Sequence, residues 1–171
     1  GVTVSHSTPT TYTYRNNSVT SVNASGYMLQ AGDEIVGSGN NNLRGETITG
    51  NKFTWNGTDA SSITHGIFTG YQLDVNIKYN YLDKVPMSII RKSNGMTNTT
   101  GAVAYNIVKN PVATAVVVKG MNNVCIYNNT FYSNKTGAET WRALVQVYSN
   151  DTPVAASTGT RIKNNIFYTV N

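Results

Sequence analysis

A small set of cationic and aromatic side chains carries most of the chemistry that this sequence offers. Arginine can grip a carboxylate or a sulfate through paired hydrogen bonds, and an indole ring can lie against a sugar ring. Residues of these types lie in short apolar runs, or in the loops before them, at intervals along the chain. The sequence therefore predicts that an acidic polysaccharide binds through Trp55, His65, Lys84, Arg91, Trp141 and Arg142.

Cleavage of a polysaccharide needs further groups in defined positions. Hydrolysis usually uses two carboxylates, and a lyase needs a base together with a group, often calcium, that neutralises the substrate carboxylate. The apolar runs that carry the histidine and the arginines contain no Asp or Glu, although three acidic loop residues could converge on them: Asp59, Asp83 and Glu139. No cofactor is expected, and calcium is compatible but not indicated. The candidate catalytic residues are His65, Arg91, Arg142 and Asp83, with a purely structural role as the alternative for His65.

Composition narrows the function classes further. The 171 residues fit a single domain, of which 12% are charged, and the net charge is +5. Lysine and arginine form no dense run, so nucleic-acid binding is not expected. No apolar run is long enough to cross a membrane, so membrane insertion is not expected. Cys125 is the only cysteine, which excludes an internal disulfide and a metal site built on thiolates.

One short phrase recurs along the chain: an apolar residue, two others, Asn, one other and a second apolar residue. It occupies residues 48–53, 77–82, 103–108, 126–131 and 162–167, and a weaker copy occupies 14–19. Successive marker asparagines are 23 to 36 residues apart, as in solenoid proteins. The phrase defines a structural column of Asn17, Asn51, Asn80, Asn106, Asn129 and Asn165.

A second pattern, a small residue followed by two apolar ones, lies once between each pair of marker asparagines. Its copies are 26–28, 66–68, 88–90, 115–117 and 143–145. Stacked coils of a parallel β-helix place like residues on like, and asparagine suits both a left-handed corner and a hydrogen-bonded ladder. Unrelated strands of a β-sandwich are the alternative. The β-helix predicts one buried stack of Ile48, Ile77, Val103, Ile126 and Ile162.

Residues 124–131 and 161–168 resemble the repeats of right-handed parallel β-helix proteins of the pectate-lyase-like and phage-tailspike type. The resemblance implies that each marker Asn lies at the corner between the second and third strands of a coil. It also implies that the small-residue runs are first strands, which form a glycan groove together with the loops before them. The expected fold is all-β: a right-handed parallel β-helix of about six coils with Asn-marked corners, in a single domain over residues 1–171.

Three functions are compatible with this fold, since fold does not imply function. The first is a virion-associated structural and receptor-binding segment, like a tailspike or tail fibre, that binds a surface polysaccharide. The second is a secreted polysaccharide lyase or glycoside hydrolase, and the third is a spacer without a ligand. We expect an extracellular or virion location. We also expect either a homo-oligomer, a trimer above all, or a segment of a longer protein, because an open β-helix end exposes strand edges.

Overall fold

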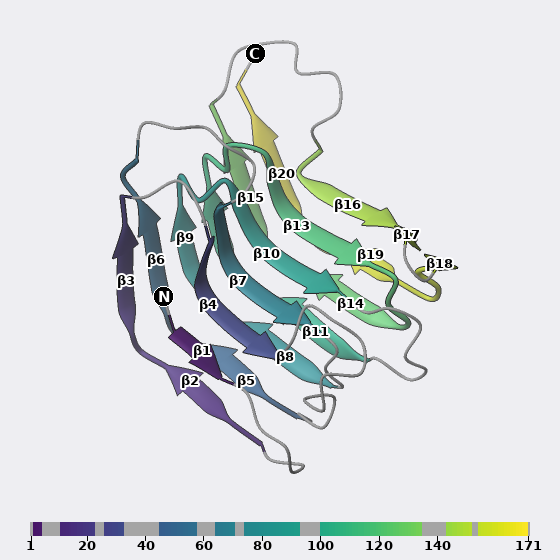
Figure 1. The fold of residues 1–171 in the computed structure, drawn as a ribbon. Coiled ribbons are helices and arrows are strands. Elements are labelled where there is room, and N and C mark those ends of the chain that lie inside the picture. The colour runs from purple at the N-terminus through teal and green to yellow at the C-terminus, as the bar shows by residue number, and fades with distance from the viewer. Residues whose placement is uncertain are drawn as a thin grey trace.

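The structure is a computed structural model that describes residues 2–4, 11–22, 26–32, 45–57, 64–70, 74–92, 100–134, 143–151 and 154–170. All regular structure in these residues is β: three parallel sheets with six strands each, and one short antiparallel pair (Figure 1). The chain passes from the first sheet to the second and the third, and then returns to the first. The expected all-β fold with parallel strands is therefore confirmed, and the molecule is a parallel β-solenoid.

The strands of each sheet follow in chain order. The first sheet contains β1 (Val2–Val4), β4 (Gly26–Gly32), β7 (Thr64–Gly70), β10 (Met87–Lys92), β13 (Thr114–Lys119) and β16 (Val145–Tyr148). The second contains β2 (Thr13–Arg15), β5 (Thr47–Thr49), β8 (Val75–Lys78), β11 (Gly101–Ala104), β14 (Val124–Tyr127) and β19 (Arg161–Lys163). The third contains β3 (Ser18–Ser21), β6 (Lys52–Trp55), β9 (Tyr81–Asp83), β12 (Ile107–Lys109), β15 (Thr130–Ser133) and β20 (Ile166–Thr169).

One strand from each sheet, taken at the same place in the three orders, makes up a rung of the stack. Between the first and second sheets of the last rung lies an antiparallel pair, β17 (Asn150–Asp151) and β18 (Val154–Ala155). In Figure 1 the last rung lies at the opposite end of the stack from β1, β2 and β3. Within the described residues, no helix is long and apolar enough to cross a membrane.

One column of apolar side chains on the second sheet points into the core. Pairing in register aligns Tyr14, Ile48, Ile77, Val103, Ile126 and Ile162. Four of the five residues predicted to form a buried stack are at most 2% exposed, whereas Ile162 is 48% exposed. The prediction is wrong for Ile162 because, in the described part of the chain, no strand pairs with β19 on the side away from β14.

The marker asparagines form a hydrogen-bonded ladder at the corner between the second and third sheets. In each step, the backbone N–H and the side-chain Nδ2 of one asparagine donate to Oδ1 of the next, at 2.9 to 3.1 Å. The Nδ2 group of Asn80 also donates to the carbonyls of Ile48 and Lys78. Because the hydrogen-bonding groups of the amide all have partners, this polar side chain can be buried in the core. The ladder contains Asn17, Asn51, Asn80, Asn106, Asn129 and Asn165.

The left-handed backbone at each corner lies one residue earlier than the sequence suggests. Asparagine was expected to supply this conformation itself, yet no ladder asparagine has a positive φ. The residue before it does, with φ between 53° and 66°. These preceding residues are Asn16, Gly50, Tyr79, Tyr105, Asn128 and Asn164. The corner therefore divides two tasks between neighbours: one residue turns the chain and the next bonds the rungs together.

Candidate functional site

The outer face of the first sheet carries His65, the predicted histidine. His65 pairs in register with Tyr27 on β4 and Met87 on β10. The Tyr27 ring stacks on the imidazole with 4.9 Å between ring centroids, and it lies 4.6 Å from the Phe68 ring. His65 is partly buried. Three neighbouring rungs thus contribute one aromatic and apolar cluster around the imidazole.

This first sheet is apolar on both faces, which explains why its sequence does not reveal the inner one. The column of Leu29, Ile67, Ile89 and Val116 belongs to the main core. The column one residue later includes Phe68, Ile90 and Val117, which form a separate buried cluster with Tyr27 and Met87 packed against it. The outer face therefore has an apolar centre, and its polar contacts lie toward the strand ends.

Cations lie at the far ends of these strands. Lys92, the last residue of β10, pairs in register with Lys119 at the end of β13. Lys119 in turn pairs with Tyr148, and its Nζ lies 5.2 Å from the centroid of that ring. Both lysines are partly buried, whereas Tyr148 is 42% exposed. The outer face thus changes from aromatic to cationic along the strand direction.

Arg91 is predicted on the ligand-binding face, but the structure buries it completely, so this expectation is wrong. Its register column, with Ala31, Thr69 and Val118, points into the core. Its guanidinium donates to the carbonyls of Val75, at 2.7 Å, and Thr100, at 3.3 Å. A guanidinium held in this way bridges the first and second sheets and is not open to a polysaccharide.

Trp55 is also predicted to bind sugar, and it too is buried. It ends β6, is 5% exposed and belongs to the main core. Its ring packs so closely over Gly57 that a methyl group there would lie 2.5 Å from it. The indole is therefore a structural side chain, and the sugar-binding expectation is wrong for it.

Two loop residues keep positions near the surface. Lys84 is exposed and has a left-handed backbone with φ 60° directly after β9. Asp83 ends β9 and is partly buried, and its Oδ1 has no hydrogen-bond partner. Trp141 and Arg142 lie outside the described residues, as do Asp59 and Glu139. Across the described part of the chain, no group of three or more His, Cys, Asp and Glu side chains could hold a metal ion.

A buried acid, Glu46, is a site that sequence reasoning missed. It directly precedes β5 and is 2% exposed, and neither carboxylate oxygen has a hydrogen-bond partner. Burial raises its pKa to about 7, although the charge of Arg91 acts in the opposite direction. Burial likewise lowers the pKa of Arg91 to about 10, against the attraction of Glu46 and Asp74. For both groups desolvation therefore outweighs the attraction between them.

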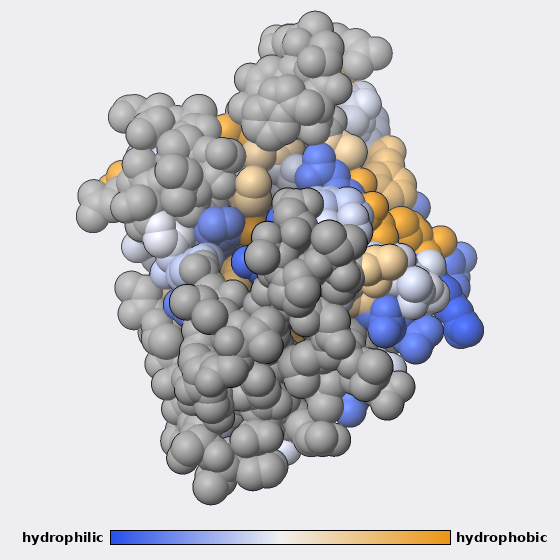
Figure 2. Space-filling model, turned by 45° about the vertical axis from the view of Figure 1, so that its right-hand side comes forward, coloured by the Kyte–Doolittle hydropathy of each residue, from blue (hydrophilic) through white to orange (hydrophobic). Residues whose placement is uncertain are grey.

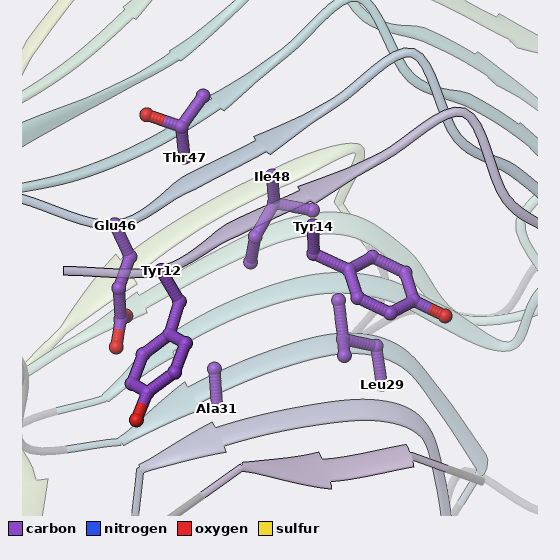
Figure 3. Close-up of a pocket in the computed structure, with 7 residues that line it drawn as sticks. All are labelled: Tyr12, Tyr14, Leu29, Ala31, Glu46, Thr47 and Ile48. Atoms are coloured by element: carbon purple, nitrogen blue, oxygen red, sulfur yellow. The ribbon is translucent and has the colours of Figure 1, made fainter.

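Glu46 lies on the wall of a small, mostly apolar pocket of about 20 Å³ near the first rungs (Figure 3). In Figure 3 its side chain and that of Tyr12 extend in the same direction from neighbouring strands. Nearby, the Thr100 hydroxyl donates to the Asp74 carboxylate. The only sequence signal for this site was an acid next to the apolar phrase that begins at Ile48. The pocket is lined by Tyr12, Tyr14, Leu29, Ala31, Glu46, Thr47 and Ile48.

Comparison with known proteins adds no family to this description. No family model, no curated protein and no solved structure matches the chain at a significant level.

Proposed function

We propose that the chain is a glycan-directed, right-handed parallel β-helix of tailspike type, a structural and receptor-binding segment that belongs on a virion or another extracellular surface. Six strands in each sheet support about six coils. A right-handed path is the expected one, because crossovers between parallel strands almost always have that hand. The ligand is an acidic polysaccharide, which is the class that combined aromatic and cationic contacts favour.

The observation that carries this proposal is the ordered outer face of the first sheet. Tyr27, His65 and Met87 lie in register at the start of the strands, and Lys92 and Lys119 lie in register at their ends. The two ends of β10 are five residues, or roughly 16 Å, apart. One sugar of a chain can therefore pack on the partly buried rings of Tyr27 and His65 while the acidic group of a sugar further along the same chain meets the lysines. Binding is favoured over cleavage because Arg91, one of the candidate catalytic cations, already donates to backbone carbonyls inside the core.

Variants of the first sheet should weaken binding to an immobilised acidic polysaccharide such as polygalacturonate. Tyr27→Ala should lower the affinity about two- to tenfold, the usual worth of one aromatic contact. Lys92→Ala should lower it by up to about fivefold and reduce its dependence on salt, because exposed ion contacts are screened. Lys109→Ala removes the same charge from the exposed outer face of the third sheet and is the matched control. Biolayer interferometry at several salt concentrations measures both effects.

A product assay on the same polysaccharide separates this function from its alternatives. The parent should release neither unsaturated products nor new reducing ends. Products that disappear in His65→Ala would instead identify a lyase or hydrolase with His65 as its base. If the parent bound no glycan in an array of acidic and neutral polysaccharides, the spacer role would replace the proposal.

We extend the proposal to the open end of the stack, which should be covered by a further coil, either from a second copy or from a continuation of the chain. Ile162 and Phe167 are 48% and 50% exposed, whereas Ile126 and Phe131, their register partners one rung earlier, are fully buried. In the right-hand part of Figure 2, hydrophobic residues are open to solvent beside hydrophilic ones. An apolar sheet edge of this kind favours pairing with another strand.

Self-association should therefore rise with protein concentration in sedimentation velocity and fall in Phe167→Lys. The physical reason is that a lysine on the last rung places a charge where a further coil would otherwise bury the ring of Phe167. A parent that remains monomeric at every concentration would rule out a second copy as the cover.

A further inference from the structure

The corner between the second and third sheets carries a feature that the fold does not explain. Four of the six turning residues before the ladder asparagines are Asn or Gly, the types that tolerate a left-handed backbone. The other two are Tyr79, with φ 58°, and Tyr105, with φ 56°. A bulky residue in this conformation is an outlier that costs folding free energy, and such strain is concentrated at functional sites.

The two tyrosines are well exposed, so burial does not offset their strain. Tyr79 is 60% and Tyr105 40% exposed. Their rings stack with centroids 5.0 Å apart and an angle of 9° between planes. The ring of Tyr127, one rung further, meets Tyr105 edge-on at 5.6 Å. Consecutive rungs thus build a continuous row of aromatic side chains along the outside of the corner.

Cations border this row on both sides. Lys78 and Lys163 share the register column of Tyr127 on the second sheet. The Nζ of Lys163 lies 6.0 Å from the centroid of the Tyr127 ring, and on the third sheet the Nζ of Lys52 lies 6.0 Å from that of Tyr81. In the described structure, these two register columns and the corner between them contain no Asp or Glu. The row and its cations form a tyrosine ridge of Lys52, Lys78, Tyr79, Tyr105, Tyr127 and Lys163.

We propose that the tyrosine ridge is a second binding site, which holds an acidic polysaccharide lying along the axis of the stack. Carboxylate or sulfate groups meet the lysines, and the exposed tyrosines offer ring surface and hydroxyl groups to the sugar. The ridge is separate from the face of the first sheet, because all its residues come from the other two sheets and the corner between them. Its action does not depend on binding at that face.

The geometry favours a polysaccharide over single-stranded nucleic acid. Nucleic-acid sites of this kind use open aromatic faces on which successive bases stack. Here Tyr79 and Tyr105 already stack on each other, so a base cannot insert between their rings, whereas a sugar needs only the ring surface and hydroxyl groups that stay exposed. The cations are also spaced along the rungs rather than gathered in the dense basic run or patch that is typical of nucleic-acid sites.

The decisive variant is Tyr79→Asn combined with Tyr105→Asn, because asparagine already occupies the same corner position at Asn16, Asn128 and Asn164. Relief of backbone strain should keep the melting temperature at or above that of the parent. Affinity for polygalacturonate or dextran sulfate should fall roughly tenfold, the sum of two aromatic contacts. Tyr168→Asn is the matched control, since Tyr168 is 55% exposed and stacks on Tyr132 at 5.4 Å outside the ridge. It should leave the affinity unchanged.

Binding is measured by interferometry on the two acidic polysaccharides, on neutral dextran and on a single-stranded oligonucleotide. The proposal requires that the parent prefer the acidic polysaccharides and that the double variant, but not the control, lose this preference. Equal affinity of parent and double variant would overturn it, and so would tighter binding of the oligonucleotide or equal binding of neutral dextran. Lys92→Ala affects the first sheet only, so binding at the two sites can be tested separately. If the double variant loses affinity and Lys92→Ala keeps it, the result supports binding at the ridge and not at the first sheet.

Discussion

Ile126→Ala should lower the free energy of unfolding by about 2 to 5 kcal/mol, the range for removing a large side chain from a packed core. Ile126 is fully buried on β14 and lies in register between Val103 and Ile162. Neighbouring rungs are tied together by parallel pairing and by the ladder, so the backbone has little freedom to collapse into the space left behind. Urea denaturation followed by circular dichroism measures the loss.

The matched control is Ile107→Ala. Ile107 begins β12 and is 47% exposed on the outer face, so the same substitution should change stability by less than about 1 kcal/mol. Equal losses for the two variants would show that the inner column does not form the core of the folded protein in solution.

Acidification from pH 8 to pH 4 should stabilise the protein through Glu46. Its pKa is about 7 in the folded state and near 4.5 when exposed. The folded state therefore binds a proton that the unfolded chain releases between these values, so stability is greatest below pH 4.5 and is lost as the pH rises through 7. The difference corresponds to about 3 kcal/mol. Arg91 adds no slope in this window, because its pKa of about 10 keeps it charged throughout.

Glu46→Gln isolates this effect, since an amide of nearly the same shape does not titrate. The free energy of unfolding is measured at several pH values for both proteins, and the contribution of every other ionisable group cancels in the difference. The stability of the parent relative to the variant should fall steadily from pH 4.5 to pH 7. A constant difference over that range would mean that Glu46 is not a buried, raised acid in the folded protein.

The recurring Asn phrase was enough to predict the parallel stack, because every turn of a solenoid must place the same residue type at the same corner. The ladder that joins Asn17 to Asn165 and the inward column from Ile48 to Ile126 both follow from this repetition. A ladder amide such as that of Asn80 donates to the Oδ1 of the asparagine on the next rung as well as to nearby backbone carbonyls, so the spacing of the asparagines in the sequence indicates their position in space.

Burial on the first sheet was decided only by the tertiary structure. Its strands are apolar on both faces, so no alternation in the sequence assigns Arg91 to the inside or the outside. Arg91 lies inward in the same register column as Thr69 and Val118 on the adjacent rungs, and two backbone carbonyls accept hydrogen bonds from its guanidinium. Trp55 is a different case, because β6 alternates: Lys52 is exposed whereas Phe53 and Trp55 are buried, so alternation along that strand could have placed the indole in the core.

The sequence by itself therefore determined the repeat, the ladder and the apolar columns, all of which depend on residue type at a fixed interval. The tertiary structure alone decided that Glu46 and Arg91 are buried and that Tyr79 and Tyr105 are exposed. Glu46 and Arg91 are distant in sequence, yet their charges interact inside the core. Tyr79 and Tyr105 come into contact only when their rungs stack. Contacts between rungs depend on how the strands align in three dimensions. Local sequence patterns could therefore predict the repeating scaffold, but they could not predict these sites.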